Sequence, residues 1–411
     1  MSLPFSLFLA LKYLRPKRSY ISVISIISVI GVMLGVAVLI IVLSVMSGFD
    51  DMWRKKILDF DAHITVTRAG LIENPGRLAA CLEADNGVVA AAPFVQGLVF
   101  VQRGQAVFTP FLRGIDPEAE KRVSLIPSCV RQGVFRLEDE EVVIGSELAA
   151  RLNATPGDTI LVYSPQSFLS GDELTLPLEL TVVGVFEVGM WEYDIGFVLV
   201  SLPTAWELFR MQGGAHGIRV TTSDPFQARP VAARLADHLA GEGPDFHVRT
   251  WMELNRQLFD ALKVEKSLMF FLLVFIILVA AFGIANTLIV VVVQKRREIG
   301  LLRALGFSSG SVMRVFFWMG TIQGAVGTAL GIGFGLLVLH YRNHLMRGMA
   351  EMLRMELLPK QLYHLSEIPA RTSWGDLATI AGLAMTICTL AGALAAYRAV
   401  RLDPAHALRY E

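Results

Sequence analysis

The sequence has 411 residues, of which 54% are hydrophobic and only 18% are charged, and its mean hydropathy is +0.53. This composition is too apolar for an ordinary soluble protein of this length and indicates an integral membrane protein. The formal net charge of +0 lacks the basic excess that is typical of nucleic-acid-binding proteins, so we expect no nucleic-acid partner.

Four stretches are apolar enough to span a bilayer, whose hydrocarbon core takes about 20 helical residues. Charged residues are absent from Ser19 to Phe49 and from Ser267 to Gln294. We predict transmembrane helices at 19–49, 266–294, 314–341 and 374–397. The first is too long for a signal peptide and lacks a small-residue cleavage site, so we expect it to remain as an anchor.

Basic residues orient these spans. Lys12, Arg15, Lys17 and Arg18 precede the first span, which predicts a cytoplasmic N-terminus at 1–18. Four crossings then place a coupling segment at 295–313 and a tail at 398–411 in the cytoplasm, and a loop at 342–373 outside it. That loop also carries five basic residues, which are more typical of the cytoplasmic side, so its composition disagrees with this orientation. The expected location is the bacterial inner membrane, multi-pass, with both termini cytoplasmic.

The insert at 50–265 has the mixed pattern of an α+β domain. Helical patterns cover Gly76–Glu83 and Pro225–Leu239, and ATPGD at 154–158 predicts a turn between a helix and a strand. The expected strands are His63–Thr67, Val142–Ile144, Thr159–Tyr163, Leu180–Phe186 and Phe197–Val200. We therefore predict a multi-pass α-helical membrane protein of four transmembrane helices, with one large α+β periplasmic domain inserted between helices 1 and 2.

Candidate chemistry is sparse in this sequence. GFSSG at 306–310 fits the G-x-S-x-G pattern, but it follows a helix where a nucleophile elbow needs a strand, so it favours a helix end with Gly306 at positive φ. No phosphate-binding loop pattern occurs. The eight histidines have no paired metal-ligand spacing. We predict no catalytic residue, no metal and no bound cofactor. Whether Cys81 and Cys129 form a disulfide stays open.

Glycines recur at three- and four-residue intervals in the third span and, as a pair, in the first. Such positions let another helix approach backbone to backbone. Packing within the chain and contact with a second subunit remain equal alternatives. The residues are Gly31, Gly35, Gly320, Gly324, Gly327, Gly331 and Gly335.

The segment at 295–305 lies between two spans and is amphipathic. Ile299, Leu302 and Leu305 share roughly one side, and basic residues keep the segment hydrated at the interface. This pattern leaves two alternatives open: the segment docks into a groove of a cytoplasmic partner, or it lies on the lipid surface.

Several stretches resemble a known family. Residues 297–316 read REIGLLRALGFSSGSVMRVF and resemble the coupling segment of ABC permeases of the MacB and FtsX type. The start at 11–51, the segment LLPKQLYHLSEIP at 357–369 and the end RLDPAHALRYE at 401–411 are similar to the lipoprotein-releasing permeases, the LolC/LolE family. The resemblance covers the whole chain, with a MacB-like core in the insert. It departs at Ala395, where the family often has proline, and we expect a straighter helix end there.

The resemblance implies a machine with several partners. Two permease chains, paralogous or identical, would be driven by two copies of a cytoplasmic ABC ATPase that binds ATP and Mg²⁺. They would extract triacylated lipoproteins from the outer leaflet and pass them to a periplasmic carrier. Whether this chain is LolC-like, LolE-like or a homodimeric single permease stays open. The residues implied in coupling are Arg296, Arg297, Glu298, Leu302, Arg303 and Leu305.

The same resemblance implies cargo contacts near the outer ends of the first two spans, where ordinary lipid-facing side chains are the alternative. These positions are Val45, Met46, Phe49, Met52, Trp53, Leu262, Met269, Phe270 and Leu273. A carrier-binding hook is implied within 164–178, where a plain hairpin loop is the alternative. Its candidate residues are Pro165, Gln166, Phe168, Leu169 and Pro177.

Three other functions fit parts of the pattern. A MacB-like efflux permease usually carries a fused ATPase, but only about 18 residues precede the first span here. An FtsX-like transmitter to a periplasmic regulator generally has a shorter insert. A scaffold that works without an ATPase leaves the amphipathic segment unexplained.

Overall fold

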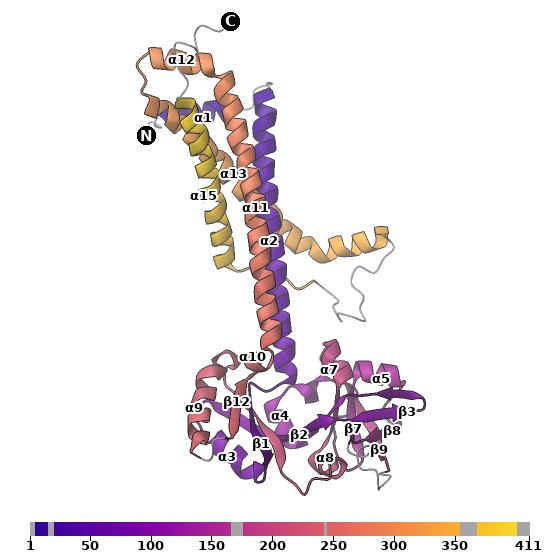
Figure 1. Cartoon of the computed structure of the whole chain (residues 1–411). Helices are drawn as coiled ribbons and strands as arrows, with labels where there is room; N and C mark the ends of the chain where they lie inside the picture. The colour runs from indigo at the N-terminus through magenta and orange to yellow at the C-terminus, as the bar shows by residue number, and fades with distance from the viewer. Residues whose placement is uncertain (1–4, 15–19, 166–175, 242–244, 354–367, 401–411) are drawn as a thin grey trace. The chain divides into compact units, whose positions relative to one another are not determined.

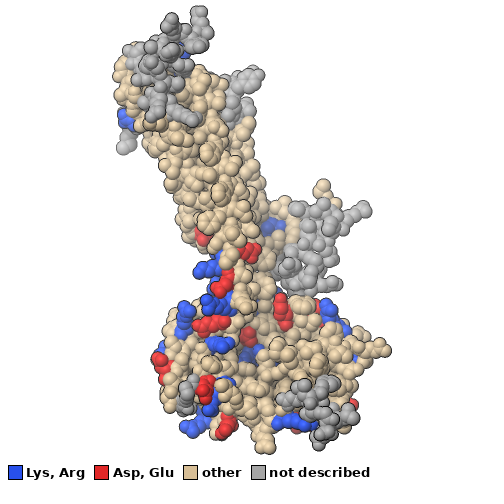
Figure 2. Space-filling view, viewed as in Figure 1, with Lys and Arg blue, Asp and Glu red and all other residues tan. Residues whose placement is uncertain are grey.

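The computed structural model describes residues 5–14, 20–165, 176–241, 245–353 and 368–400, which form two compact units (Figure 1). The membrane unit takes the described residues of Met1–Asp51, Ala261–Leu357 and Glu367–Glu411. The inserted domain takes those of Met52–Asp260. Lys, Arg, Asp and Glu gather over the inserted domain in Figure 2, whereas the long helices of the membrane unit show few of them.

Within the described residues, four helices are long and apolar enough to cross a membrane, namely α2, α11, α13 and α15. The predicted spans fall within them, apart from Ser19, which lies outside the described residues. Three helices continue well beyond the apolar stretch because no proline interrupts the polar residues that follow or precede it. The helices of this part of the chain are α1 (Phe5–Leu14), α2 (Tyr20–Phe60), α11 (Arg256–Gln294), α12 (Arg296–Ala304), α13 (Ser309–Leu353) and α15 (Trp374–Val400). The segment predicted as a loop at 342–373 is therefore helical up to Leu353.

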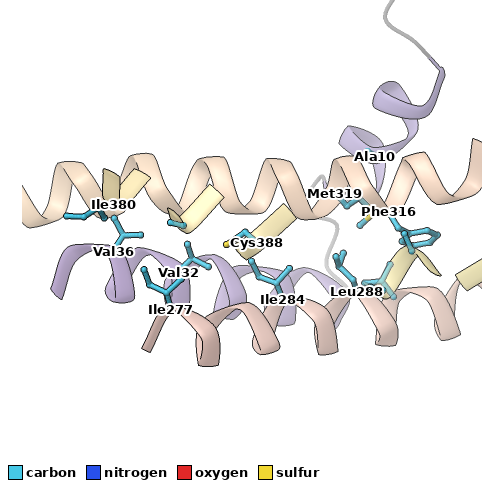
Figure 3. Close-up of a cluster of buried hydrophobic side chains, with 14 of the residues drawn as sticks. Ala10, Val32, Val36, Ile277, Ile284, Leu288, Phe316, Met319, Ile380 and Cys388 are labelled. Atoms are coloured by element: carbon cyan, nitrogen blue, oxygen red, sulfur yellow. The ribbon is translucent and has the colours of Figure 1, made fainter. Parts of the chain in front are cut away.

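The core of the membrane unit is built from side chains of all four long helices, as Figure 3 shows. Val32 and Val36 of α2 lie with Ile284 and Leu288 of α11, and Cys388 of α15 is buried among them. Cys388 therefore serves in packing, as its position in an apolar span predicts.

The glycines of α13 lie where this helix approaches its neighbours most closely. A Cβ atom at Gly324 would lie 2.6 Å from Cβ of Cys388 on α15, and one at Gly331 would lie 2.7 Å from the carbonyl oxygen of Met33 on α2. The positions at which such a Cβ would lie within 3.3 Å of α2 or α15 are Gly320, Gly324, Gly327, Gly331 and Gly335. Gly31 has open space instead, and Gly35 leaves an ordinary 3.7 Å to Ile276 on α11. The close contacts are thus made within this chain.

The inserted domain is an α+β domain around one twelve-stranded mixed sheet. Its order is β12-β1-β11-β2-β5-β10-β7-β9-β8-β3-β4, and β6 pairs with β9 outside this path. The strands are β1 (Ile64–Ile72), β2 (Val88–Leu98), β3 (Phe100–Arg103), β4 (Ala106–Phe108), β5 (Phe111–Ile115), β6 (Val130–Gly133), β7 (Glu141–Gly145), β8 (Thr159–Tyr163), β9 (Leu178–Phe186), β10 (Phe197–Ser201), β11 (Ala215–Thr222) and β12 (Phe246–Thr250).

Short helices cover this sheet, and their ends follow local chemistry. Asp116 caps α4 by accepting the backbone N–H of Glu118 at 2.9 Å, and Thr250 with Glu253 forms a capping box on α10. The predicted turn at 154–158 joins α5 to β8, with Gly157 at φ +101°. The helices are α3 (Pro75–Glu83), α4 (Pro117–Val123), α5 (Ser146–Leu152), α7 (Trp191–Gly196), α8 (Leu202–Leu208), α9 (Ala228–Ala240) and α10 (Trp251–Leu254), with single 3₁₀ turns at Ile126–Cys129 and Pro225–Gln227.

Strand β2 connects the two halves of this sheet. Its first part pairs with β11 from Val88 to Phe94, and its last part pairs with β5 from Phe94 to Leu98. One apolar core lies around β1, β11, α3 and α9, and another around β7, β8, β9 and α5. A third cluster with Phe60, Phe94 and Phe186 lies between β2, β9 and the end of α2. Cys81 and Cys129 are free thiols in this domain.

Candidate functional site

The coupling segment contacts the first helix of the chain. The hydroxyl of Tyr13 on α1 donates a hydrogen bond of 3.1 Å to Oε2 of Glu298 on α12. The Nζ atom of Lys295 forms an ion pair with Glu298 and lies 5.4 Å from the centre of the Tyr13 ring. Burial and the Glu298 carboxylate raise the pKa of Tyr13 above its ordinary value, so its hydroxyl remains a donor.

Apolar residues of α1 also contact α12 and the turn that follows it. The rings of Phe5 and Phe307 stack with centroids 4.7 Å apart, and Ile299 is buried beside Leu9. Leu305, by contrast, is 69% exposed, and Leu301 is 59% exposed. Ile299 and Leu305 therefore do not share one free docking face, because α1 covers Ile299. The outward apolar residues of the segment are Leu301 and Leu305.

The polar residues of the segment divide in a similar way. Arg297 and Glu298 are exposed at the surface of α12. Arg296 and Arg303 lie on the same helix, but their side chains fall outside the described part of the structure. Gly306 has φ +93°, and the backbone N–H of Ser311 donates to Oγ of Ser308 at 3.3 Å. The sequence interpretation of GFSSG as a helix end followed by a helix start is thus confirmed.

The cargo candidates on α2 fall in two groups. Val45, Met46 and Phe49 are half-buried on α2 within the membrane unit. Met52 and Trp53 belong to the inserted domain, where they line a cavity of about 210 Å³. Other lining residues of this cavity are Lys56, Gly189, Met190, Trp191 and Glu192. The 189–192 segment was not predicted, since nothing in its pattern distinguishes it from a loop.

Of the candidates on α11, Phe270 lines a different cavity. Phe270 and Phe271 line a space of about 350 Å³ in the membrane unit, together with Leu43 of α2 and Ile380 of α15. Lys266 and Asp376 also border this cavity. Leu262 and Met269 are half-buried, and the side chain of Leu273 falls outside the described structure. The cavity's α15 wall was missed because sequence pattern does not say which spans pack together.

The hook candidates lie on the connection of a hairpin. Strands β8 and β9 pair antiparallel with Val162 opposite Leu178, so residues 164–177 join their ends. Pro165 is the second residue after β8, and Pro177 directly precedes β9. Gln166, Phe168 and Leu169 lie outside the described residues.

Known proteins match both parts of the chain. Residues 25–238 match the MacB-like periplasmic core domain, and residues 270–404 match the FtsX-like permease C-terminal family. The chain is 34% identical to the lipoprotein-releasing system transmembrane protein LolC of Xylella fastidiosa (strain Temecula1 / ATCC 700964), over 99% of both chains. It is 31% identical to LolC of Neisseria meningitidis serogroup B over 98% of this chain and 99% of that relative. It is 27% identical to LolE of Haemophilus influenzae over 99% of both.

The matches thus extend from one end of the chain to the other, across the spans, the inserted domain and the coupling segment. Its four apolar helices and α+β domain have the arrangement expected for such a membrane protein with a large periplasmic domain. The chain belongs to the LolC/LolE family of lipoprotein-releasing transmembrane proteins, within the MacB/FtsX-type permeases.

Proposed function

We propose that this chain is the permease subunit of an ABC transporter that extracts lipoproteins from the outer leaflet of the inner membrane and passes them to a periplasmic carrier. The observation that carries this proposal is the 34% identity to a lipoprotein-releasing LolC protein across 99% of both chains. A match of that length includes the coupling segment, the inserted domain and all four spans, so it supports the whole activity rather than one module.

The energy would come from a separate cytoplasmic ATPase, present in two copies, that binds ATP and Mg²⁺. Its docking surface on this chain would be the outward side of the coupling segment, where Leu301 and Leu305 are exposed beside Arg297 and Glu298. A short amphipathic helix with exposed leucines suits a groove in such a partner. With the coupling segment on the cytoplasmic side, both termini of this chain also lie in the cytoplasm.

The cargo would be a triacylated lipoprotein. Moving acyl chains out of the bilayer costs about 0.8 kcal/mol for each CH₂ exposed to water, so extraction needs both an energy source and an apolar surface. The cavity beside Phe270, Phe271 and Leu43 supplies apolar walls in the membrane unit. The cavity beside Met52, Trp53 and Met190 supplies soft, adaptable walls in the periplasmic domain.

A second permease chain, paralogous or identical, would complete the transmembrane route. The periplasmic carrier would be received at the connection between β8 and β9, residues 164–177, which contains Pro165 and Pro177. Residues between these prolines would form the hook.

The test is conditional depletion of this protein in its native host, followed by separation of inner and outer membranes. Retention of outer-membrane lipoproteins in the inner membrane, reversed by the wild-type gene, is the expected result. An integral inner-membrane protein and an outer-membrane β-barrel protein serve as controls and must keep their normal fractions. Correct lipoprotein sorting after depletion would contradict the proposal.

A further inference from the structure

The last residues of α2 are enclosed by the inserted domain. The ring of Phe60 is fully buried and stacks on Tyr193 of α7 with centroids 4.3 Å apart. The ring of Phe197 on β10 lies 4.7 Å from it. The helix ends there, with the N–H of Asp61 still donating to the carbonyl of Ile57 at 2.7 Å. This end therefore projects into the core.

Arg219 of β11 holds the backbone of that helix end. Its Nη2 atom donates to the carbonyl oxygen of Phe60 at 2.5 Å, and its Nη1 atom pairs with Oε1 of Glu120 on α4. The Arg219 side chain is only 3% exposed, and that of Glu120 is 1% exposed. The hydroxyl of Ser124 donates to the same Glu120 oxygen. A cation at the carboxyl end of a helix is favoured by the helix dipole, and this one is also hydrogen-bonded.

Arg113 of β5 contacts the side chains of Phe60 and Asp61. Its guanidinium lies 4.7 Å from the centres of the Phe60 and Phe197 rings. Its Nε atom donates to Oε1 of Gln96 at 2.9 Å, and its Nη2 atom lies 3.4 Å from Oδ1 of Asp61. The hydroxyl of Tyr193 donates to Oδ2 of Asp61 at 2.8 Å.

Burying these charged side chains has a large desolvation cost. Burial, followed by the charge of Arg219, lowers the pKa of Arg113 to about 10. Nη1 of Arg113 and Oε2 of Glu120 have no hydrogen-bond partner among the described residues. Apolar residues of similar size often stabilise a core as well as a buried ion pair does. Stability alone therefore gives no reason for two arginines here, whereas a fixed geometry does.

The groups that meet at Phe60 and Asp61 come from both halves of the sheet. Arg219 lies on β11, whose apolar side chains belong to the core around β1 and α9. Tyr193 lies on α7, which packs against α5 and β7 beside the other core, and its side chain also packs against the core around β1 and α9. Arg113 lies on β5, which pairs with both β2 and β10. The end of α2 is thus held by side chains from both halves of the sheet.

We propose that Arg113 and Arg219 are positioning residues that fix the end of α2 in the sheet, so that a movement of α2 during transport displaces both halves of the periplasmic domain together. The inference rests on the proposed transport function. It predicts that loss of these contacts uncouples ATP hydrolysis from lipoprotein release without unfolding the protein.

The test uses the purified complex of this chain with its ATPase and partner permease. The variant Arg219→Met with Glu120→Leu removes the bond to Phe60 and leaves no unpaired buried charge. The matched control is Arg234→Met with Asp85→Leu. Arg234 also pairs with a carboxylate, that of Asp85, and donates to a backbone carbonyl of this domain, that of Asn86. Neither of these two partners lies on α2. Two quantities are measured for each variant: the lipoprotein released per ATP hydrolysed, and the thermal midpoint of unfolding.

We expect release per ATP to fall at least about fivefold in the first variant, which corresponds to roughly 1 kcal/mol of lost coupling, and less than about twofold in the control. Because release per ATP does not depend on the amount of folded protein, a merely structural role would leave it unchanged. An unchanged ratio, or a parallel loss of release and ATP hydrolysis, would overturn the inference.

A second variant covers the case in which the double replacement does not fold. Arg113→Lys keeps the charge but loses the planar stacking on Phe60 and Phe197 and the fixed direction of the donors. The same loss of release per ATP is expected, and an unchanged ratio would again overturn the inference. If the wild-type complex itself releases no lipoprotein, the proposed function fails, which is a distinct result.

Discussion

The Tyr13 hydroxyl donates to the Glu298 carboxylate at 3.1 Å, which joins α1 to the coupling helix α12 across 285 residues of sequence. The stacked rings of Phe5 and Phe307 reinforce the same contact at 4.7 Å. Within the described residues, α1 therefore contacts one side of the coupling segment, whereas Leu301 and Leu305 are exposed on another. Under the proposed function, a push by the ATPase on the exposed side would be passed to α1 through Glu298 and Phe307.

Replacing Tyr13 with phenylalanine should weaken the transmission of the ATPase stroke. The variant keeps the ring beside Lys295 but removes the donor to Glu298, a contribution of about 0.5–1 kcal/mol for a partly exposed hydrogen bond. Lipoprotein release per ATP should fall by about two- to fivefold. The matched control, Tyr341→Phe on α13, removes an exposed hydroxyl away from α12 and should leave the ratio unchanged. Equal ratios in both variants would contradict this role.

Leu305→Asp should weaken binding of the ATPase subunit. Leu305 is exposed on the outward side of the coupling segment, and a carboxylate there would be desolvated without a partner in an apolar groove. Co-purification of the ATPase with this chain should fall by about tenfold, equivalent to about 1.4 kcal/mol. Leu125→Asp, at a similarly exposed leucine of the periplasmic domain, should co-purify normally. Full retention of the ATPase by Leu305→Asp would exclude this docking side.

Gly331→Ala should destabilise the membrane unit. The new Cβ would lie 2.7 Å from the carbonyl oxygen of Met33, so α13 and α2 must separate, at a cost of about 1–3 kcal/mol. Gly333→Ala is the control, because its Cβ meets no atom within 4 Å and alanine is the better helix former. The thermal midpoint in detergent should fall for Gly331→Ala only. A similar midpoint for both variants would show that the close approach is not required.

The periplasmic domain should lose stability in mild acid through His63. Its Nδ1 atom accepts the backbone N–H of Thr222 at 2.9 Å, and burial lowers its pKa despite the nearby charge of Asp224. The unfolded chain takes up a proton on this ring below about pH 6.5, whereas the folded protein resists it, so unfolding becomes easier as pH falls from there toward the folded-state pKa.

His63→Asn retains an acceptor for Thr222 and removes the titrating group. The thermal midpoint of this variant should fall less than that of the wild type between about pH 7.5 and about pH 5.5. His238→Asn, at an exposed position on α9, should keep the wild-type dependence. An equal fall in His63→Asn and wild type would assign the acid sensitivity to other groups, among them His216, whose pKa burial also lowers.

Much of the fold follows from local pattern in the sequence. Long apolar runs predict the four spans. Runs of β-branched residues between turn signals predict strands such as β8 and β10. Strand β2 escaped prediction because its AAAP stretch has low β propensity, and its place is set by pairing with β11 and β5 on both sides. Pairing between distant strands has no local signature.

The candidate sites were predictable to a similar degree. The coupling segment has an amphipathic pattern that marks it, but the cover that α1 provides depends on a contact between Tyr13 and Glu298, which no local pattern encodes. Arg113 and Arg219 lie in the apolar contexts FLRGI and GIRV, and such charges within buried strands were a usable signal. Of the cargo candidates, Met52 and Trp53 line one cavity and Phe270 lines another, and sequence positions alone do not reveal which other residues complete each cavity wall.

Strand β2 has a consequence for how the periplasmic domain unfolds. Because its first residues belong to the ladder with β11 and its last to the ladder with β5, neither core can melt without stripping hydrogen bonds from a strand that the other core needs. The two halves are thereby made a single cooperative unit, and a calorimetric scan of this domain's unfolding should contain one heat-absorption peak rather than two. The domain that is proposed to move as one unit during transport would therefore also unfold as one unit.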